Sequence, residues 1–129
     1  MIVRFLVETP ESIPAPFKGV FPFFAKIEEG AKIVHLPEIV LFQAYFVLTS
    51  YYEVPAPLAA EKLEHIVRFK GISLPDKHIA EECLRITKYE NIDIVDAWIL
   101  AYSTAKGITG TYSFDKDLAR LGLKLLKVE

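Results

Sequence analysis

Residues 91–118 read NIDIVDAWILAYSTAKGITGTYSFDKDL, and the order of elements in this stretch points to the fold class. Asp93 predicts the start of a helix over Ile94 to Lys106, because an aspartate there accepts hydrogen bonds from the free N–H groups of the first turn. Gly107 predicts the end of that helix, since glycine readily adopts the conformation of a helix stop. Ile108 to Phe114 is rich in β-forming residues and predicts a strand. A helix therefore leads directly into a strand here.

The rest of the chain alternates in the same way between helical and apolar segments. Near the start, Met1 to Val7 fits either a strand or a helix, and Phe17 to Glu29 is helical if Pro22 starts or kinks it. Strands that alternate with helices predict a parallel sheet with helices on both faces, and so an α/β class in a single domain over residues 1–129. We expect further strands over Ile33 to Leu36, Ile72 to Leu74 and Leu123 to Val128, and helices over Glu38 to Tyr52, Pro57 to Lys70, from Asp76 to about Tyr89, and Lys116 to Leu121.

The composition excludes several classes of protein. Of the 129 residues, 52% are hydrophobic and 25% are charged, so the chain is not mainly a disordered tail or linker. The net charge of −2 excludes binding to nucleic acid by bulk positive charge, and such a contact needs a local site. Cys83 is the only cysteine, which excludes a disulfide framework and fits a reducing cytoplasm. The longest apolar run, Ile39 to Ser50, is too short to span a bilayer, so no membrane partner is expected.

We expect Asp96 and Asp115 to lie where ligands bind to a parallel sheet, at the carboxyl ends of the strands where the next helix begins. Asp96 lies in the first turn of the helix that Asp93 starts, and Asp115 directly follows the strand that ends at Phe114. Two carboxylates brought together at adjacent strand ends repel each other, which raises at least one pKa unless a cation lies between them. Mg²⁺ suits this place because it takes oxygen ligands, and it can activate a water molecule against a phosphodiester.

Helix capping explains the same residues without a metal. Asp93, Asp96, Asp115 and Asp117 all lie at predicted helix starts. Aspartate is favoured there because it accepts hydrogen bonds from free N–H groups and complements the helix dipole. The residue pattern by itself leaves the metal and the capping interpretations open.

Three segments resemble one known family. The stretch from Asn91 to Tyr102, with Tyr112 to Leu118 after it, resembles the C-terminal half of PIN domains, the nuclease fold of VapC-type toxins. In that family an acidic residue opens a helix in a D-F-x-D-A context and T/S-F-D closes the next strand. Leu36 to Thr49, LPEIVLFQAYFVLT, resembles the family's x-P-x-x-V-L-A-E-x-x-Y-V-L helix. Ile2 to Leu6 resembles the start of its first helix, which follows D-x-N.

This resemblance implies a function as well as a fold. It implies a three-layer α/β/α fold with a mostly parallel central sheet, and an enzyme that uses Mg²⁺ or Mn²⁺ to hydrolyse RNA phosphodiesters. A VapC-type toxin has an antitoxin protein as partner, and dimers of identical chains are common in the family, so RNA, an antitoxin and a second copy are the expected partners. The rival interpretation is an inactive PIN-fold module that binds protein or RNA. A third is an unrelated α/β domain in which the aspartates only cap helices.

The resemblance also assigns roles to individual residues. Asp96 matches the third acid of the family and Asp115 the fourth, while Asp93 and Asp117 match positions that are often acidic. The second acid falls on Gln43, a degenerate position that offers a carbonyl oxygen without a charge. Glu38 is no substitute, because five residues along a helix place it about 140° from Gln43 around the axis.

The first acid of the family falls ahead of Met1. We therefore hypothesise that Met1 is an internal start, and that the first central strand, ending in Asp-x-Asn, precedes it. Alternatively, Met1 to Val7 is that strand and Glu8 is the first acid. Under the family alignment Arg4 lies near the acidic pocket and is the best candidate for a phosphate contact.

Overall fold

The computed structural model describes all of residues 1–129 as a mixed α/β chain that is mostly helical. None of its helices has the length and apolar character that crossing a membrane requires. The elements in chain order are α1 (Ile2–Val7), the 3₁₀ helix η1 (Ala15–Phe17), α2 (Val20–Glu29), β1 (Val34–His35), α3 (Glu38–Phe46), the π-helix η2 (Val47–Tyr51), α4 (Ala56–Val67), β2 (Ile72–Ser73), α5 (Lys77–Tyr89), α6 (Ile94–Lys106), β3 (Gly110–Thr111), α7 (Lys116–Arg120) and β4 (Lys124–Leu125).

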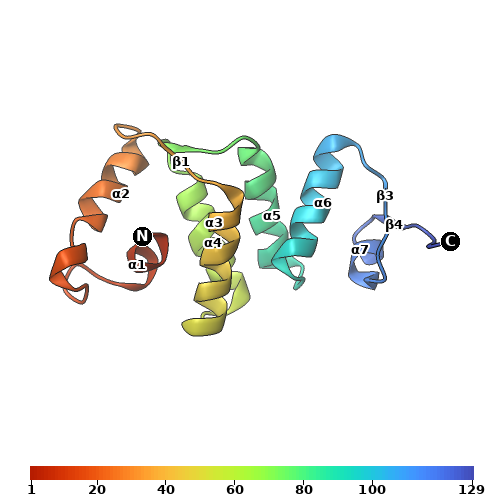
Figure 1. Cartoon of the computed structure of the whole chain (residues 1–129), viewed down its shortest axis with the longest axis horizontal. Coiled ribbons are helices and arrows are strands. Elements are labelled where there is room, and N and C mark those ends of the chain that lie inside the picture. Colours follow the sequence, from red (N-terminus) through yellow and green to blue (C-terminus); the bar gives the residue numbers. More distant parts are fainter.

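The elements follow one another along the long axis of the molecule in nearly chain order (Figure 1). The N-terminal helices α1 and α2 lie at one end, α3 to α6 form the middle, and α7 with β3 and β4 lies at the other end. The candidate acids, on α6 and α7, therefore belong to the C-terminal part of the molecule.

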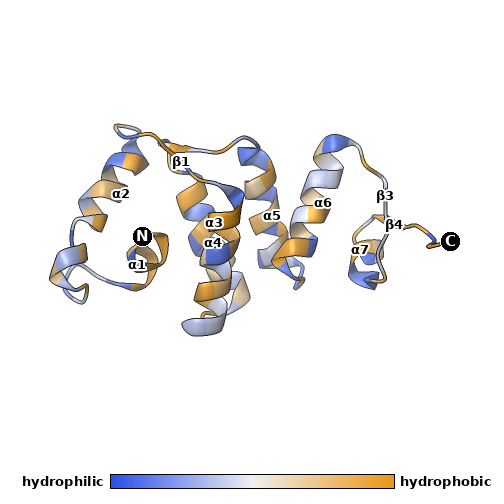
Figure 2. Cartoon of the chain, in the orientation of Figure 1, coloured by the Kyte–Doolittle hydropathy of each residue, from blue (hydrophilic) through white to orange (hydrophobic).

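The middle of the molecule is a layer of helices in which α5 packs against both α4 and α6. Leu63 and Ile66 of α4, Leu84 of α5 and Ile94 of α6 are completely buried there. Hydrophobic and hydrophilic residues alternate along α5, as one apolar face requires (Figure 2). Full burial of each such side chain contributes about 1.5–3 kcal/mol, so this layer holds α6, and with it Asp96, in place.

The strands pair into two separate parallel sheets of two strands each. In the first, β1 pairs with β2 and Val34 lies opposite Ile72; in the second, β3 pairs with β4 and Gly110 lies opposite Lys124. The single central sheet expected from the sequence is therefore not formed. β1 and β3 each have a partner on one side only, and pairing covers two residues in every strand.

The predicted helices are found with small shifts. The helix over Ile94 to Lys106 is confirmed, with Asp93 at its start and Gly107 in the left-handed conformation, at φ 70°, at its end. The helix expected over Glu38 to Tyr52 divides into α3 and the π-helical η2. Met1 to Val7 forms the helix α1 and not a strand, so the alternative that Glu8 ends a first strand is wrong.

Gly71 joins the N-terminal elements to the helical middle through a close backbone contact. Its N–H donates to the Ile27 carbonyl at the end of α2 at 2.8 Å, and its carbonyl accepts from Val34 N–H at 2.8 Å. A Cβ atom at this position would collide with the Lys32 carbonyl and lie 2.7 Å from the Ile27 carbonyl. Only glycine therefore fits between α2 and β2 without a shift of the backbone.

Replacing Gly71 with alanine tests this contact. We expect Gly71→Ala to lower the free energy of unfolding by about 1–3 kcal/mol, because the added methyl group pushes α2 away from β2. Urea denaturation followed by circular dichroism measures the change. Gly19→Ala is the matched control, since a Cβ there meets nothing within 4 Å. Equal stability of the two variants would show that the backbone at Gly71 moves aside freely.

Candidate functional site

The first candidate acid lies where α6 begins. The Asp93 side chain accepts a hydrogen bond from Val95 N–H at 2.7 Å and so fixes the first turn. Asp96 follows in that turn with its side chain half-buried, between the completely buried residue Ile94 and the buried residue Ala97. The capping interpretation is thus correct for Asp93, whose carboxylate serves its own helix, whereas Asp96 makes no such cap.

The second candidate acid lies where α7 begins. Asp115 accepts from Asp117 N–H at 2.9 Å, which makes it the N-cap of α7. Its own N–H donates to the hydroxyl of Ser113 at 3.0 Å. Sequence reasoning did not single out Ser113, although a serine two residues ahead of an aspartate is a local signal for such a turn. Ser113 therefore helps to hold Asp115 at the end of the β3 segment.

The structure brings the carboxyl groups of Asp96 and Asp115 close enough to interact, so that Asp96, when protonated, donates a hydrogen bond to Asp115. Burial first, and then the hydrogen bond and charge of Asp115, raise the pKa of Asp96 from 3.8 to about 6. The hydrogen bond from Asp96, followed by the one from Asp117 N–H, lowers the pKa of Asp115. Two acids that repel each other in this way form a place where a cation is favoured.

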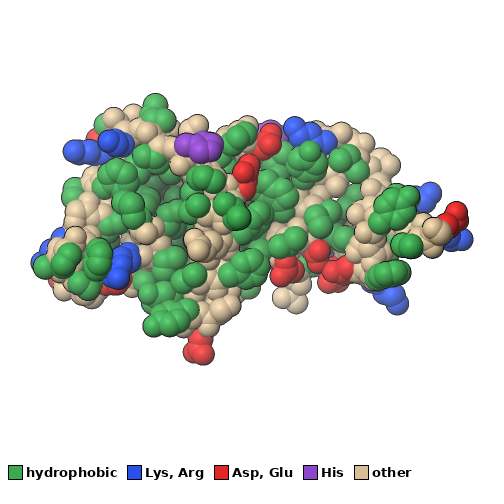
Figure 3. All heavy atoms as spheres, viewed as in Figure 1, with side chains coloured by type: hydrophobic (Ala, Val, Ile, Leu, Met, Phe, Trp, Pro, Cys, Tyr) green, Lys and Arg blue, Asp and Glu red, His purple; other side chains and the backbone are tan.

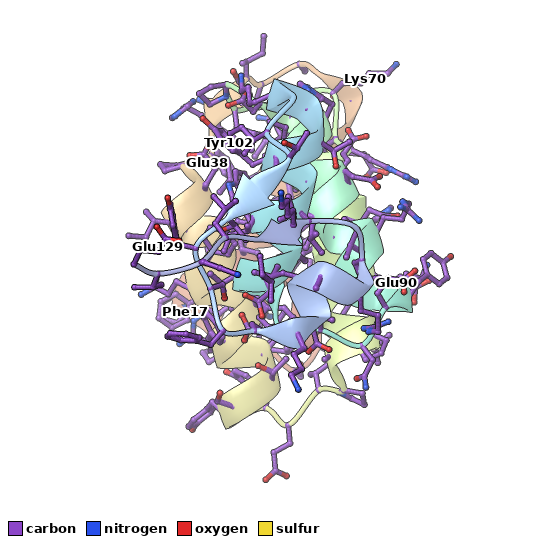
Figure 4. The ribbon with its side chains drawn as sticks, turned by 90° about the vertical axis from the view of Figure 1, so that its right-hand side faces the viewer. Phe17, Glu38, Lys70, Glu90, Tyr102 and Glu129 are labelled. Atoms are coloured by element: carbon purple, nitrogen blue, oxygen red, sulfur yellow. The ribbon has the colours of Figure 1, made fainter.

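Asp93 and Asp117 lie near this pair, but neither completes a group of three metal ligands with it. Their charges contribute to the raised pKa of Asp96. The Asp117 carboxylate lies 3.6 Å from the Arg120 side chain, which also donates to the Glu90 carbonyl at 3.3 Å. Glu90 is seen beside α7 in the end-on view (Figure 4). No group of three His, Cys, Asp or Glu side chains is assembled for a metal ion.

Gln43 and Arg4 lie on other elements than this pair, although α3 contacts α6 through Phe42 and Trp98, whose ring centroids are 5.3 Å apart. Gln43 is on α3 and lines a pocket beside β1. Arg4 is on α1, where its guanidinium pairs with Glu8 at 3.1 Å and lies 3.9 Å from the centre of the Phe17 ring. α1 and α7 lie near opposite ends of the molecule (Figure 1). The roles of Gln43 as a degenerate acid position and of Arg4 as a phosphate contact remain predictions.

The donor set fits a hard divalent cation bound by few protein ligands. Asp96 and Asp115 present their carboxylate oxygens close together. A proton between them occupies the place that a cation would take. Mg²⁺ in proteins is often held by one or two carboxylates and keeps several water molecules, which leaves positions for substrate phosphates. Asp96 and Asp115 would therefore hold the ion.

Comparison with known proteins gives one match. The model of the PIN domain family matches residues 22–124, which include β1, α6 and both candidate acids. Neither the curated proteins nor the solved structures contain a match to the chain.

The Asp96 proton predicts how stability depends on pH when no divalent ion is present. The folded state holds the Asp96 proton up to a pKa of about 6, and the unfolded state only up to 3.8, so the stabilising contribution is complete below pH 3.8 and is lost as the pH rises through 6. The lowered pKa of Asp115 acts only below 3.8, so it does not mask this window. We expect the melting temperature, measured in EDTA, to fall more for the natural chain than for Asp96→Asn between pH 4 and pH 7. Parallel curves for the two proteins would contradict the raised pKa of Asp96.

Proposed function

Because the chain belongs to the PIN domain family, a family of nucleases, we propose that it is a divalent-metal-dependent ribonuclease with Asp96 and Asp115 as its metal ligands. The observation that carries this proposal is the pair of carboxyl groups of Asp96 and Asp115, which lie close together at the starts of α6 and α7. PIN domains typically use divalent metals. The proposed ion is Mg²⁺ or Mn²⁺, and the proposed reaction is hydrolysis of RNA phosphodiesters.

The residues of the pair support this chemistry in two ways. When Asp96 loses its proton, Asp96 and Asp115 are both carboxylates and concentrate negative charge at one point. A Mg²⁺ or Mn²⁺ ion, when bound, lowers the pKa of a bound water and neutralises the charge of a phosphate group. Ser113 and the N–H of Asp117 hold the Asp115 carboxylate in place, which preserves the distance between the two carboxyl groups.

The net charge of the chain is compatible with this mode of RNA binding. At −2 the chain has no bulk attraction for phosphates, so the affinity must come from the metal site and from local cations. We further propose the toxin role of the VapC type, with an antitoxin and a second copy of the chain as partners and with RNA in the cytoplasm as the target. These finer assignments are supported by the resemblance of residues 91–118 to that group.

An inactive binding module is the second candidate function. Gln43 supports this candidate, because the resemblance places it at an acid position of the family, where it offers no charge, and it lines a pocket that neither Asp96 nor Asp115 lines. Only two carboxylates are brought together, and a missing carboxylate removes one favourable charge from a divalent ion. A PIN fold with a weakened metal site can retain a binding surface while losing its reaction.

RNA cleavage in the presence of Mn²⁺ separates the two candidates. We expect the natural chain to cleave a single-stranded RNA, and Asp96→Asn to lose about 100-fold or more of the rate, because one of two metal ligands is gone. Asp76→Asn is the matched control. It also removes a carboxylate at a helix start, but Asp76 pairs with Lys106 at 3.7 Å, at the opposite end of α6 from Asp96. Cleavage fragments are measured on denaturing gels.

The outcomes are distinct. A loss in Asp96→Asn with full activity in Asp76→Asn supports the ribonuclease. Equal background cleavage in the natural chain and both variants would remove the enzyme and favour the binding module. Mn²⁺ binding without cleavage, measured by calorimetry, would retain the metal site and exclude the reaction on that RNA.

A further inference from the structure

Two exposed aromatic side chains lead directly to one of the acids. Tyr112 is 70% exposed and Phe114 is 90% exposed, whereas Thr111 and Ser113, which alternate with them, are half-buried. Side chains of an extended segment point to its two faces in turn, so both rings lie on one outer face. Asp115 is the next residue along the chain. The outer face that carries the two rings therefore ends beside the acid pair.

Lys124 adds a positive charge to this outer face. Lys124 is exposed and lies opposite Gly110 in the pairing of β3 with β4. Residues that lie opposite each other share a face of the sheet, and Gly110 shares its face with Tyr112 and Phe114 by alternation. None of the ion pairs in the chain uses Lys124, so its charge is free to meet a ligand.

The inner face of the same two strands is covered, and the outer face is not. Leu125, which lies opposite Thr111, packs against the hydrophobic core on the inner side. At this end of the molecule, where β3 and β4 lie, hydrophobic side chains are exposed beside lysine and arginine side chains (Figure 3). The aromatic rings are thus presented to solvent together with cations.

Rings and a cation in this arrangement suit the unpaired bases of RNA. Every base has a flat face that stacks on an aromatic ring, and a lysine attracts the phosphate that follows. Side chains two residues apart on a strand are separated by about 6.6 Å. This is nearly twice the rise of about 3.4 Å between stacked bases, so each ring can receive a base of its own.

A protein partner fits this face less well. An aromatic side chain buries about 150–250 Å², so the two rings together supply less than the roughly 800 Å² that each partner buries in a stable interface. A nucleotide strand needs no such area, because it is also held at its phosphates. The proposed metal ligand Asp115, which follows Phe114 directly, lies where such a phosphate would be bound.

We propose that Tyr112 and Phe114 stack on unpaired bases of the RNA substrate, and that Lys124 contacts its backbone, so that single-stranded RNA is directed to Asp96 and Asp115. The proposal rests on the ribonuclease function, because it supplies the substrate-binding surface of the same site. It also sets a preference: the bases of a duplex are stacked on one another and cannot reach the two rings.

RNA binding in the absence of cleavage tests the proposal. A fluorescent strand of ten uridines is titrated with the natural chain in EDTA, and its anisotropy is measured. We expect Phe114→Ala and Tyr112→Ala each to weaken binding by about 5- to 100-fold, because one stacked base is lost, and Phe114→Trp to retain it. Tyr51→Ala is the matched control, since it removes another ring, 78% exposed, from η2.

A second probe separates stacking from charge. A ribose-phosphate chain of the same length without bases carries the same negative charge but offers nothing to stack. We expect Phe114→Ala to leave the affinity for this probe unchanged. Because EDTA removes divalent ions, base-dependent binding that needs Phe114 supports the proposal even where the chain fails to cleave RNA in Mn²⁺, a result that would remove only the reaction.

The opposing outcomes are equally clear. Equal affinity of the natural chain, Phe114→Ala and Tyr51→Ala for the uridine strand would overturn the proposal. Equal losses for the probes with and without bases would also overturn it, as would tighter binding of a duplex than of a single strand. A dimer in light scattering that Phe114→Ala abolishes, with RNA affinity unchanged, would assign the face to a second copy of the chain instead.

Discussion

The contact between Gly71 and the end of α2 is the constraint on which the N-terminal half of the structure depends. The N–H of Gly71 binds the Ile27 carbonyl, and its carbonyl receives the N–H of Val34, so one residue fixes α2, β1 and β2 against one another. Since β1 pairs with β2 alone, its position has no other source in the backbone. Residues of α2 and β1, which this contact holds together, line the pocket beside β1.

The C-terminal half is organised by two neighbouring helix starts. Asp93 and Asp115 are the N-caps of α6 and α7, and each accepts a hydrogen bond from an N–H of its own helix. Asp115 also lies close to Asp96. Burial of Asp96 and its proximity to Asp115 raise the pKa of Asp96 to about 6, so ionising Asp96 at neutral pH costs stability. An arrangement that costs stability and serves no packing purpose is typical of functional sites, and this supports the assignment of the pair to metal binding.

The sequence predicted those features that depend on neighbouring residues. Asp93 and Gly107 set the ends of α6 by local chemistry. Asp96 and Asp115 lie close together as expected, but Asp96 is not at a strand end, because α6 follows α5 with no strand between them. Strand lengths were not predicted, because Ile108 to Phe114 has the composition of a strand but is paired only at Gly110 and Thr111; Phe114 is 90% exposed. The contact of Gly71 with α2 was not predicted either, since it joins residues that are far apart in the chain.

The pairing of β1 with β2 also bears on the order in which the molecule folds. The two strands are separated in the chain by the whole of α3, η2 and α4, whereas α4 with α5 and α5 with α6 are direct neighbours. Closing a long loop loses more chain entropy than joining adjacent helices, so contacts between distant residues form later. The helices α4, α5 and α6 can therefore assemble first. β1 then docks on them together with α1 and α2.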